Sequence, residues 1–366
     1  MYNPLLFILL LPFAVLGQMA PEVLPEEEGM IDGPYLGYEG EELKARWAWP
    51  EKRKSDELIW SEANLDKLPE FPGFHPESVH PDAVFRRDRQ INFSGVKKIV
   101  AMSDIHGQYD VARALLHKHG VIDEDAHWIF GEGHLVIVGD VFDRGDQVNA
   151  TLWMIHNLQH EAAAVGGRVH YLLGNHETMI LEGDIRYLNK RYLTTTALLT
   201  TPYQNLYGPD TYLGRWLRSL PLTISINDQV FVHGGLSKDL LKEVSTLEKI
   251  NDLYHKELID VEPMVATSES PKADLLYGRN GPLWYRGYFL ESDFEEKDVD
   301  RILKKVKAEK LIVGHTSFDA IKSYFNGKVL AVDSIIKFGS TGEILIIEGE
   351  DYFRGDVYGK RQPLFE

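Results

Sequence analysis

The 366-residue chain contains no cysteine. This absence excludes disulfide bonds, thiolate zinc sites, iron–sulfur clusters and cysteine nucleophiles. Any metal ion in this protein must therefore be bound by His, Asp, Glu or Asn side chains.

Positive charge is scarce relative to negative charge. Lys and Arg total 39 against 56 Asp and Glu, which gives a formal net charge of −17 at pH 7. No global basic field would attract nucleic acid, so we expect no nucleic-acid partner, and a phosphate-bearing ligand would need a local cationic site. The 44% hydrophobic and 26% charged content is typical of a folded protein and excludes disorder throughout.

Long hydrophobic runs are also scarce, and the most apolar one spans residues 5–16. A bilayer-spanning helix needs roughly 20 apolar residues, so this run is too short to cross a membrane. Gly17 follows it and is a small residue suited to signal-peptidase cleavage, although no Lys or Arg precedes the run. We predict a signal peptide at residues 1–17, export to a periplasm or the exterior, and no stable membrane insertion afterwards. A buried N-terminal segment is the alternative.

Residues 18–95 differ in composition from the rest of the chain. They are rich in proline, which limits helix formation. The aromatic residues Trp47, Trp49 and Trp60 indicate short strands or loops that pack onto something larger. We predict an N-terminal extension at 18–95 that packs on a catalytic domain at 96–366.

After Gly95, short apolar runs end at polar clusters and are followed by helical periodicity, which predicts an α/β fold. Ligands of such folds bind beyond the carboxyl ends of the strands, so polar residues at these points should converge. The runs and their motifs are 98–102 before SDIHG, 135–138 before GDVFDRGD, 169–173 before GNHE, 230–232 before HGG, and 311–313 before GHT.

Six residues in these motifs have the chemistry of metal ligands. With one bridging carboxylate, for which Asp140 is the natural choice, they can hold two divalent ions. Two such ions suit phosphoester hydrolysis, because they can lower the pKa of a shared water molecule and coordinate phosphoryl oxygens. The six residues are Asp104, His106, Asp140, Asn175, His233 and His315.

The five motifs, in this order, resemble those of the calcineurin-like metallophosphoesterases. The resemblance is closer to the phosphoprotein phosphatase branch, and nearest to the bacterial Shewanella-like phosphatases, because the eukaryotic SAPNYC-type motif is absent and Val332, Asp333 and Ser334 stand in that region. Ser103 replaces the usual glycine of the first motif without removing a ligand. The resemblance implies two packed mixed β-sheets flanked by α-helices, a four-layer α/β/β/α core.

The resemblance also implies how the metal ligands divide. Asp104 and His106 would bind the first ion, and Asn175, His233 and His315 would bind the second. Asp140 would bridge the two. The ligand set accepts Mn, Fe or Zn, and we expect Mn to support activity in vitro.

The remaining roles concern catalysis. His176 resembles the general acid that protonates the leaving oxygen, and Asp143 would orient its imidazole. Arg144 and Arg286 would clamp the phosphate, with Asn175 also contacting substrate. The implied reaction is in-line attack by a metal-bridging hydroxide, without a phosphoenzyme.

Three functions remain open at this point. The leading prediction is a phosphatase of phosphorylated Ser, Thr or Tyr in proteins. The alternatives are a hydrolase of dinucleoside polyphosphates or other small phosphoesters, and a non-catalytic metal-stabilised binding protein. The last is disfavoured because His176 and Arg144 are both present.

Other polar and aromatic residues receive structural interpretations. Residues 207–218 could line a substrate groove, but we favour packing of a helix. Seven further histidines are interpreted as surface or structural residues, namely His117, His119, His127, His134, His156, His160 and His170.

Overall fold

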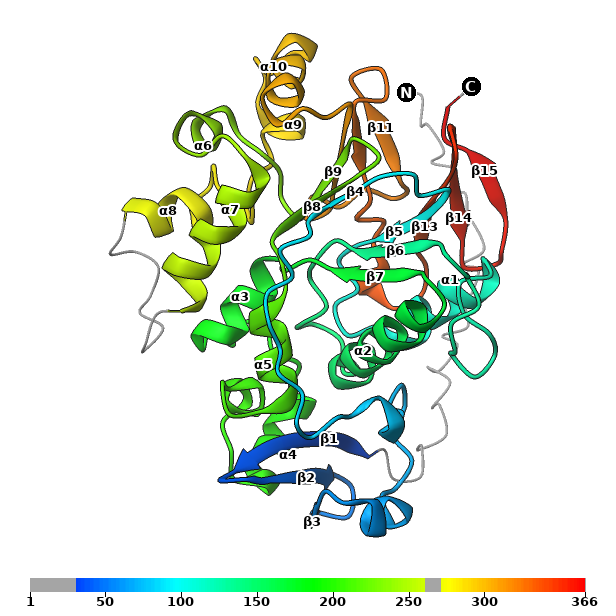
Figure 1. Ribbon diagram of the computed structural model, residues 1–366, viewed down its shortest axis with the longest axis vertical. Helices are drawn as coiled ribbons and strands as arrows, with labels where there is room; N and C mark the ends of the chain where they lie inside the picture. The colour runs from blue at the N-terminus through cyan, green and yellow to red at the C-terminus, as the bar shows by residue number, and fades with distance from the viewer. Residues whose placement is uncertain (1–30, 261–270, 366) are drawn as a thin grey trace, which may run out of the picture.

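Two six-stranded mixed sheets form the centre of the structure (Figure 1). The computed structural model describes residues 31–260 and 271–365, so the predicted signal peptide at 1–17 lies outside the described residues. Among the described residues, no helix is both long and apolar enough to cross a membrane.

The first sheet has the strand order β15-β14-β13-β5-β6-β7. Strands β5, β6 and β7 run parallel, and β13 pairs with β5 in the antiparallel sense. Most of their side chains are apolar and buried, as expected for strands covered on both faces. The strands are β5 (Lys98–Met102), β6 (His134–Ile137), β7 (Arg168–Tyr171), β13 (Glu343–Glu348), β14 (Asp351–Asp356) and β15 (Arg361–Pro363).

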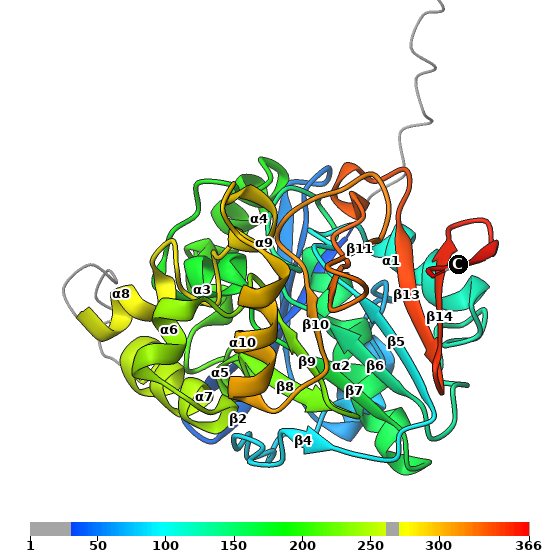
Figure 2. The same cartoon turned by 90° about the horizontal axis from the view of Figure 1, so that it is seen from above.

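The second sheet has the order β11-β12-β10-β9-β8-β4, with β9, β10 and β12 parallel. Figure 2 shows strands of both sheets in the middle of the molecule with helices on either side. The predicted fold of two mixed sheets flanked by helices is therefore confirmed. The strands are β4 (Asn92–Phe93), β8 (Thr223–Ile226), β9 (Gln229–Val232), β10 (Lys310–Val313), β11 (Lys322–Tyr324) and β12 (Val329–Ala331).

The helices occupy the connections between strands and the insertions. Helix α2 packs on β7, and α7 packs on β8. The helices are α1 (Tyr109–Lys118), α2 (Val148–Ala164), α3 (Asn175–Glu182), α4 (Arg191–Leu199), α5 (Tyr212–Ser219), α6 (Lys238–Glu243), α7 (Leu247–Tyr254), α8 (Pro271–Tyr277), α9 (Gly287–Leu290) and α10 (Glu296–Val306). Shorter turns are η1 (Glu62–Lys67), η2 (Pro76–Ser78), η3 (Tyr203–Tyr207), η4 (His255–Ile259) and η5 (Ile336–Phe338).

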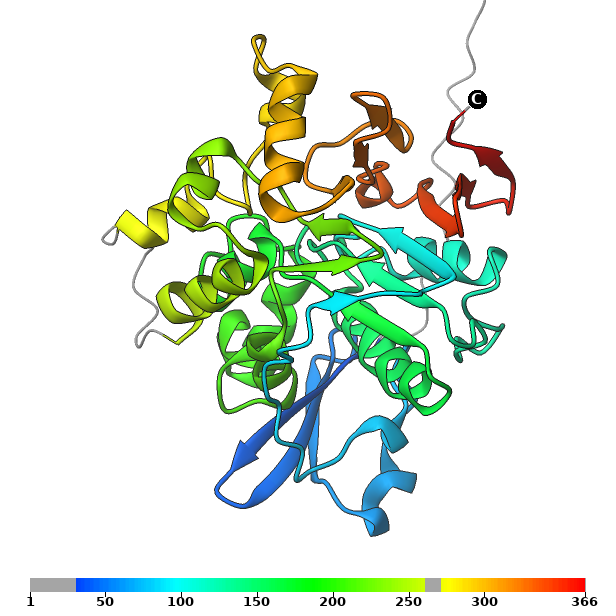
Figure 3. The ribbon, with the colours of Figure 1, turned by 45° about the horizontal axis from the view of Figure 1, so that its top comes forward.

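The segment before β4 contains a separate antiparallel sheet of β1 (Asp32–Glu39), β2 (Glu42–Trp49) and β3 (Lys54–Ile59). This sheet, blue in Figures 1 and 3, contacts α4, α5 and α2. The indole of Trp153 donates to the Pro34 carbonyl at 3.0 Å. Strand β4 then joins the second six-stranded sheet beside β8. The division of the chain at residues 95 and 96 stays a prediction.

Helix α5 decides between the two interpretations of residues 207–218. Tyr212, Leu213, Trp216 and Leu217 are all buried on it, and a threonine N-cap, Thr211, accepts from the Gly214 N–H at 3.1 Å. The favoured interpretation, packing of a helix, is confirmed.

His134 on β6 and His170 on β7 form a buried pair, with Nε2 of His170 3.0 Å from Nδ1 of His134. Phe93 on β4 contacts both rings, at centroid distances of 5.5 and 4.7 Å. Burial lowers the pKa of His170 to about 3 and that of His134 to about 4. These two histidines are therefore structural, as predicted.

This pair should make stability depend on pH. With a folded-state pKa below the unfolded value, His170 binds its proton more readily in the unfolded chain, so stability should fall as pH drops below about 6.5. Between pH 6.5 and 4.5, the free energy of unfolding should change less steeply with pH in His170→Gln than in the unaltered protein. We expect the difference in slope to be about 1 kcal/mol per pH unit. Urea unfolding at several pH values measures this, and equal slopes in the two proteins would contradict it.

Candidate metal centre and active site

The predicted site residues lie directly beyond the carboxyl ends of strands from both sheets. Asp104 and Asp140 follow β5 and β6, and Asn175 begins α3 after β7. His233 and His315 follow β9 and β10 of the second sheet. Both sheets therefore contribute side chains to one site, at the position where open α/β sheets bind ligands.

The loops that carry these residues adopt unusual backbone conformations. Six of the predicted site residues have positive φ, although none is glycine. Left-handed conformations are costly for such residues and tend to occur at functional sites, where the surrounding structure enforces them. They are Asp104 (54°), His106 (49°), Asp140 (58°), Asp143 (71°), Arg144 (66°) and His315 (63°).

Asp140 lies at the centre of the site. Its Oδ2 is 3.2 Å from Nε2 of His233, 3.7 Å from Nε2 of His106 and 3.9 Å from Nε2 of His176. Two groups of possible ligand atoms share this carboxylate, His106–Asp140–His176 and Asp140–His233–His315. The geometry thus places Asp140 between two neighbouring clusters, as a bridging ligand requires.

Hydrogen bonds to the backbone set the orientation of two imidazoles. Nδ1 of His106 donates to the Phe142 carbonyl at 2.7 Å, and Nδ1 of His233 donates to the Val138 carbonyl at 2.8 Å. Carbonyl oxygens only accept, so each Nδ1 carries the hydrogen and Nε2 faces the centre of the site. This is the usual way in which a protein prepares a histidine for metal binding.

The second cluster contains atoms that need a cation between them. Nε2 of His233 faces Oδ1 of Asn175 at 3.0 Å as well as Asp140. Nε2 of His315 is buried and makes no hydrogen bond to any described residue. A divalent ion would satisfy all of these atoms, so the residues present fit a metal ion.

Buried negative charge supports the same conclusion. Burial, with the charges of Asp333 and Asp140 nearby, raises the pKa of Asp104 to about 8. Burial alone would lower the pKa of His233, but the charge of Asp140 raises it to about 10. Carboxylates that are this poorly solvated need positive charge close by, which metal ions supply.

Asp104 is also held by two donors. The Ser103 hydroxyl donates to its Oδ2 at 2.6 Å, and the His315 backbone N–H donates to the same oxygen at 2.8 Å. Its Oδ1 lies 3.8 Å from Nε2 of His106. The serine that replaces the usual glycine of the first motif therefore orients Asp104.

His176 and Asp143 form a buried pair beside Asp140, with Nδ1 of His176 2.5 Å from Oδ2 of Asp143. Burial lowers the pKa of His176, but the charge of Asp140 and the bond to Asp143 outweigh it and raise the pKa above its ordinary value. The imidazole is thereby favoured in the protonated form that a general acid requires.

The two predicted clamp arginines both reach this site. Nε of Arg144 donates to Nε2 of His106 at 3.2 Å. Nη1 of Arg286 donates to the His315 carbonyl at 2.8 Å, and burial lowers the pKa of Arg286 while the charges of Asp104 and Asp333 oppose the shift. The structure thus brings all ten predicted site residues together.

Sequence reasoning missed Glu177, the last residue of the GNHE motif. This fully buried carboxylate accepts from the backbone N–H groups of Asp140, Val141 and Gly174 at 2.7 to 2.8 Å, and from the Tyr171 hydroxyl at 2.9 Å. It therefore joins the loop that carries Asp140 to the loop that carries Asn175. Its position in a predicted motif was a signal that could have identified it.

Tyr187 was also missed. Its ring lies 5.2 Å from the His176 ring, with the Arg144 guanidinium 5.5 Å from its centroid. Its carbonyl accepts from the Arg144 N–H at 3.0 Å. Tyr187 comes from an insertion with no motif, so only the tertiary structure could place it here.

The comparisons with known proteins agree with this geometry. Residues 97–317, more than half of the chain, match the family model described as calcineurin-like phosphoesterase. The chain therefore belongs to the calcineurin-like phosphoesterases, and it is a hydrolase of phosphoesters.

Relatives within this family confirm the predicted branch. The chain is 31% identical over 248 residues to Shewanella-like protein phosphatase 1 of Plasmodium berghei, covering 65% of this chain and 66% of that protein. It is 27% identical over 293 residues to Shewanella-like protein phosphatase 2 of Arabidopsis thaliana, covering 67% and 72%. A crystal structure of the cold-active protein-tyrosine phosphatase of Shewanella sp. is 39% identical with a TM-score of 0.82, covering 91% of this chain and 99% of that one.

Replacing Glu177 should loosen the metal centre. In Glu177→Gln, an amide NH2 would face backbone N–H donors, and the charge that strengthens these bonds would be lost. We expect metal affinity to fall by about tenfold to a hundredfold, as for other residues that support metal ligands. Equilibrium dialysis against Mn2+ measures the change.

Glu182→Gln on the same helix is a matched control. Burial raises the pKa of Glu182 to about 8, so its side chain is mostly protonated at pH 7 and already resembles glutamine in charge and shape. Its substitution should leave metal affinity unchanged. Equal losses in the two variants would show that the effect comes from α3 as a whole.

Proposed function

We propose that this chain is a phosphoprotein phosphatase that uses two divalent metal ions. The observation that carries the proposal is the carboxylate of Asp140, whose Oδ2 lies 3.7 Å from Nε2 of His106 and 3.2 Å from Nε2 of His233, with the His176–Asp143 pair beside it. A non-catalytic binding protein would need the metal ligands but not the charged acid beside them. The names of the relatives from Plasmodium and Arabidopsis support a protein substrate.

In this proposal, Asp104, His106 and Asp140 would hold one ion, and Asp140, Asn175, His233 and His315 would hold the other. Metal ions bound there would lower the pKa of water for attack and neutralise phosphoryl charge. His176 then donates the proton on Nε2 to the leaving oxygen. Asp143 accepts from Nδ1 of His176 and stabilises the protonated imidazole.

Arg144 and Arg286 reach the site from two different segments of the chain, at His106 and at His315. Arg144 follows the Asp140 loop, whereas Arg286 precedes α9 and contacts His315 from the second sheet. Two guanidinium groups can donate to different phosphoryl oxygens, and Asn175 would be a further contact. Substrate would thus be held in line with the attacking and leaving groups.

A pocket of about 370 Å3 adjoins Arg286. Tyr277, Trp284 and Tyr285 line it, and the Trp284 ring lies 5.3 Å from the His315 ring. Aromatic walls next to a phosphate clamp suit an aromatic substrate side chain. Together with the name of the Shewanella enzyme, this pocket supports phosphotyrosine as one of the substrates, beside phosphoserine and phosphothreonine.

Two finer points complete the proposal. The nitrogen and oxygen ligands suit Mn, Fe or Zn, and we propose Mn for activity in vitro. We further propose that the protein is exported to a periplasm or the exterior, on the basis of the apolar run at residues 5–16.

The proposed function can be tested with the metal-stripped chain, assayed after addition of Mn2+ on peptides carrying phosphotyrosine, phosphoserine or phosphothreonine and on diadenosine tetraphosphate. We expect peptide hydrolysis that requires Mn2+. In His176→Asn, kcat should fall by roughly 10²–10⁴-fold, because the leaving oxygen would depart without a proton. Metal content should be retained.

Three other outcomes would change the conclusion. Selective turnover of the nucleotide would favour a hydrolase of small phosphoesters. Metal binding without turnover of any substrate would favour the binding protein. Full activity of His176→Asn would remove His176 from the mechanism.

The clamp can be tested separately through inhibition by inorganic phosphate. Lysine retains the charge but cannot make the planar two-point contact of a guanidinium. We therefore expect Arg144→Lys and Arg286→Lys each to weaken phosphate inhibition by about tenfold, and to lower kcat/KM at least as much. Arg186→Lys is the control, because Arg186 is exposed and pairs with Asp184. Unchanged inhibition in both clamp variants would contradict the assignment.

A further inference from the structure

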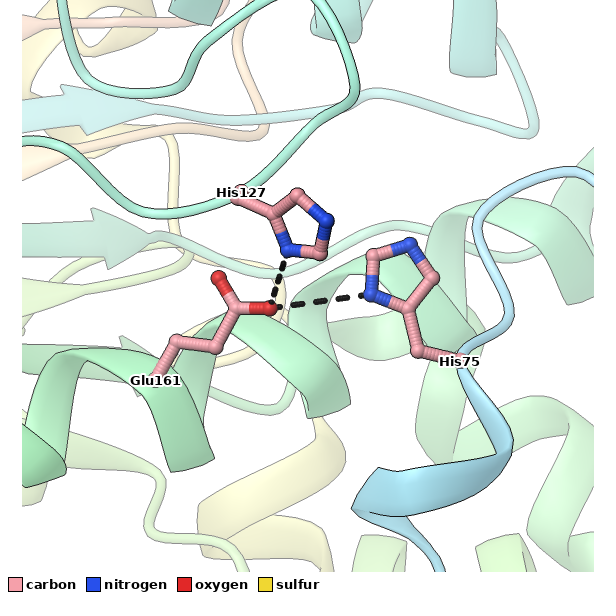
Figure 4. Close-up of side chains that lie close together, drawn as sticks. All are labelled: His75, His127 and Glu161. Carbon is pink, nitrogen blue, oxygen red and sulfur yellow. Dashed lines mark hydrogen bonds and ion pairs between the residues drawn. The ribbon is translucent and has the colours of Figure 1, made fainter.

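Three side chains from separate segments meet outside the active site (Figure 4). His75 directly precedes η2, His127 lies in the connection between α1 and β6, and Glu161 is in the last turn of α2. One ligand atom from each residue lies within 4.8 Å of the other two. We refer to these three residues as the His75 cluster.

The His75 cluster is centred on Oε1 of Glu161. This oxygen is 2.8 Å from Nδ1 of His127 and 3.6 Å from Nδ1 of His75. Zinc binds histidine nitrogen and carboxylate oxygen at about 2.0–2.2 Å, so ligand atoms around a tetrahedral ion lie roughly 3.3 Å apart. The two observed distances fall on either side of that spacing, so small side-chain rotations would complete the coordination.

An ion pair between His127 and Glu161 accounts for only part of this arrangement. The bond to Glu161 raises the pKa of His127. Nδ1 of His75, however, is buried and makes no hydrogen bond to any described residue, although it points toward the same carboxylate oxygen. The two imidazole rings lie with centroids 4.6 Å apart. A cation between the three side chains would give every one of these atoms a partner.

Neighbouring hydrogen bonds fix the Glu161 carboxylate and the backbone at the two histidines. Oε2 of Glu161 accepts from the Trp128 N–H at 2.6 Å, which leaves Oε1 for a metal ion. The His127 N–H donates to Asp123 at 2.9 Å. The His75 carbonyl accepts from the Ser78 hydroxyl at 2.8 Å. The hydrogen bond to the Glu161 carboxylate is of the kind that supports ligating carboxylates in metal sites.

The surroundings also allow an ion to enter. The side chains of His127 and Glu161 are 46% and 28% exposed, and that of His75 is 20% exposed. A water molecule could therefore occupy the fourth coordination position. Helix α2 begins at Val148, just after the loop that carries Asp140 and Arg144. Glu161 lies 13 residues further along this helix, or roughly 20 Å, so the His75 cluster is well separated from the active site.

We propose that His75, His127 and Glu161 form a second metal site, of the zinc class, distinct from the catalytic centre. Two imidazole nitrogens and one carboxylate oxygen form a ligand set that zinc uses in proteins. The ion would join residue 75, which precedes the six-stranded sheets in the chain, to α2 of the core. The site therefore has a structural role, and it does not depend on the proposed phosphatase function.

The test is the zinc content of the full chain after stripping of metals, equilibration with Zn2+ and dialysis, measured by mass spectrometry of the metal. We expect His75→Ala and His127→Ala each to retain about one zinc ion fewer per chain than the unaltered protein. The His127 side chain is half exposed, so its replacement should leave the fold intact. Unchanged phosphoester hydrolysis by both variants would show that the catalytic centre is undisturbed.

His117→Ala is the matched control, because His117 lies on nearby α1 outside the His75 cluster. It should retain the full zinc content. Equal zinc content in all four proteins would overturn the proposal and leave an ion pair only. Loss in His127→Ala without loss in His75→Ala would also overturn it, as would an equal loss in His117→Ala, since that would indicate general binding to surface histidines.

Discussion

Buried negative charge beyond the strand ends is the constraint on which the rest of the structure depends. Asp104, Asp140, Asp333 and Glu177 are all buried near one another. A buried carboxylate is costly unless hydrogen bonds and positive charges compensate it. Imidazoles, backbone N–H groups and Arg286 supply that compensation, so the loops must present these groups inward at fixed positions.

The two sheets make this arrangement possible. The strands that precede the site loops, β5, β6, β7, β9 and β10, are mostly apolar and buried, so they form a rigid base for those loops. On that base, the loops hold Asp104, His106 and Asp140 at positive φ, which an isolated chain would rarely adopt. Glu177 ties two of these loops together through backbone hydrogen bonds. Packing of the core therefore sustains the strain of the site.

Prediction from sequence worked best where a motif followed an apolar run. Strand β5 matches its predicted bounds, whereas β6 begins and ends one residue earlier than predicted. The sequence does not mark where a strand ends, because apolar residues such as Val138 continue beyond the last residue of β6. His127 was interpreted as a surface or structural residue, because its partners His75 and Glu161 are 52 and 34 residues away. Such a separation leaves no local pattern.

The sequence by itself determined the chemistry available to this protein. Its lack of cysteine restricts metal ligands to nitrogen and oxygen donors, and its five motifs supply them in order. Only the tertiary structure decided which atoms share Asp140, which histidine nitrogen faces the centre, and that Tyr187 and Trp284 border the site. These outcomes depend on the distance and orientation between chain segments that are remote in sequence, and packing of the two sheets fixes both.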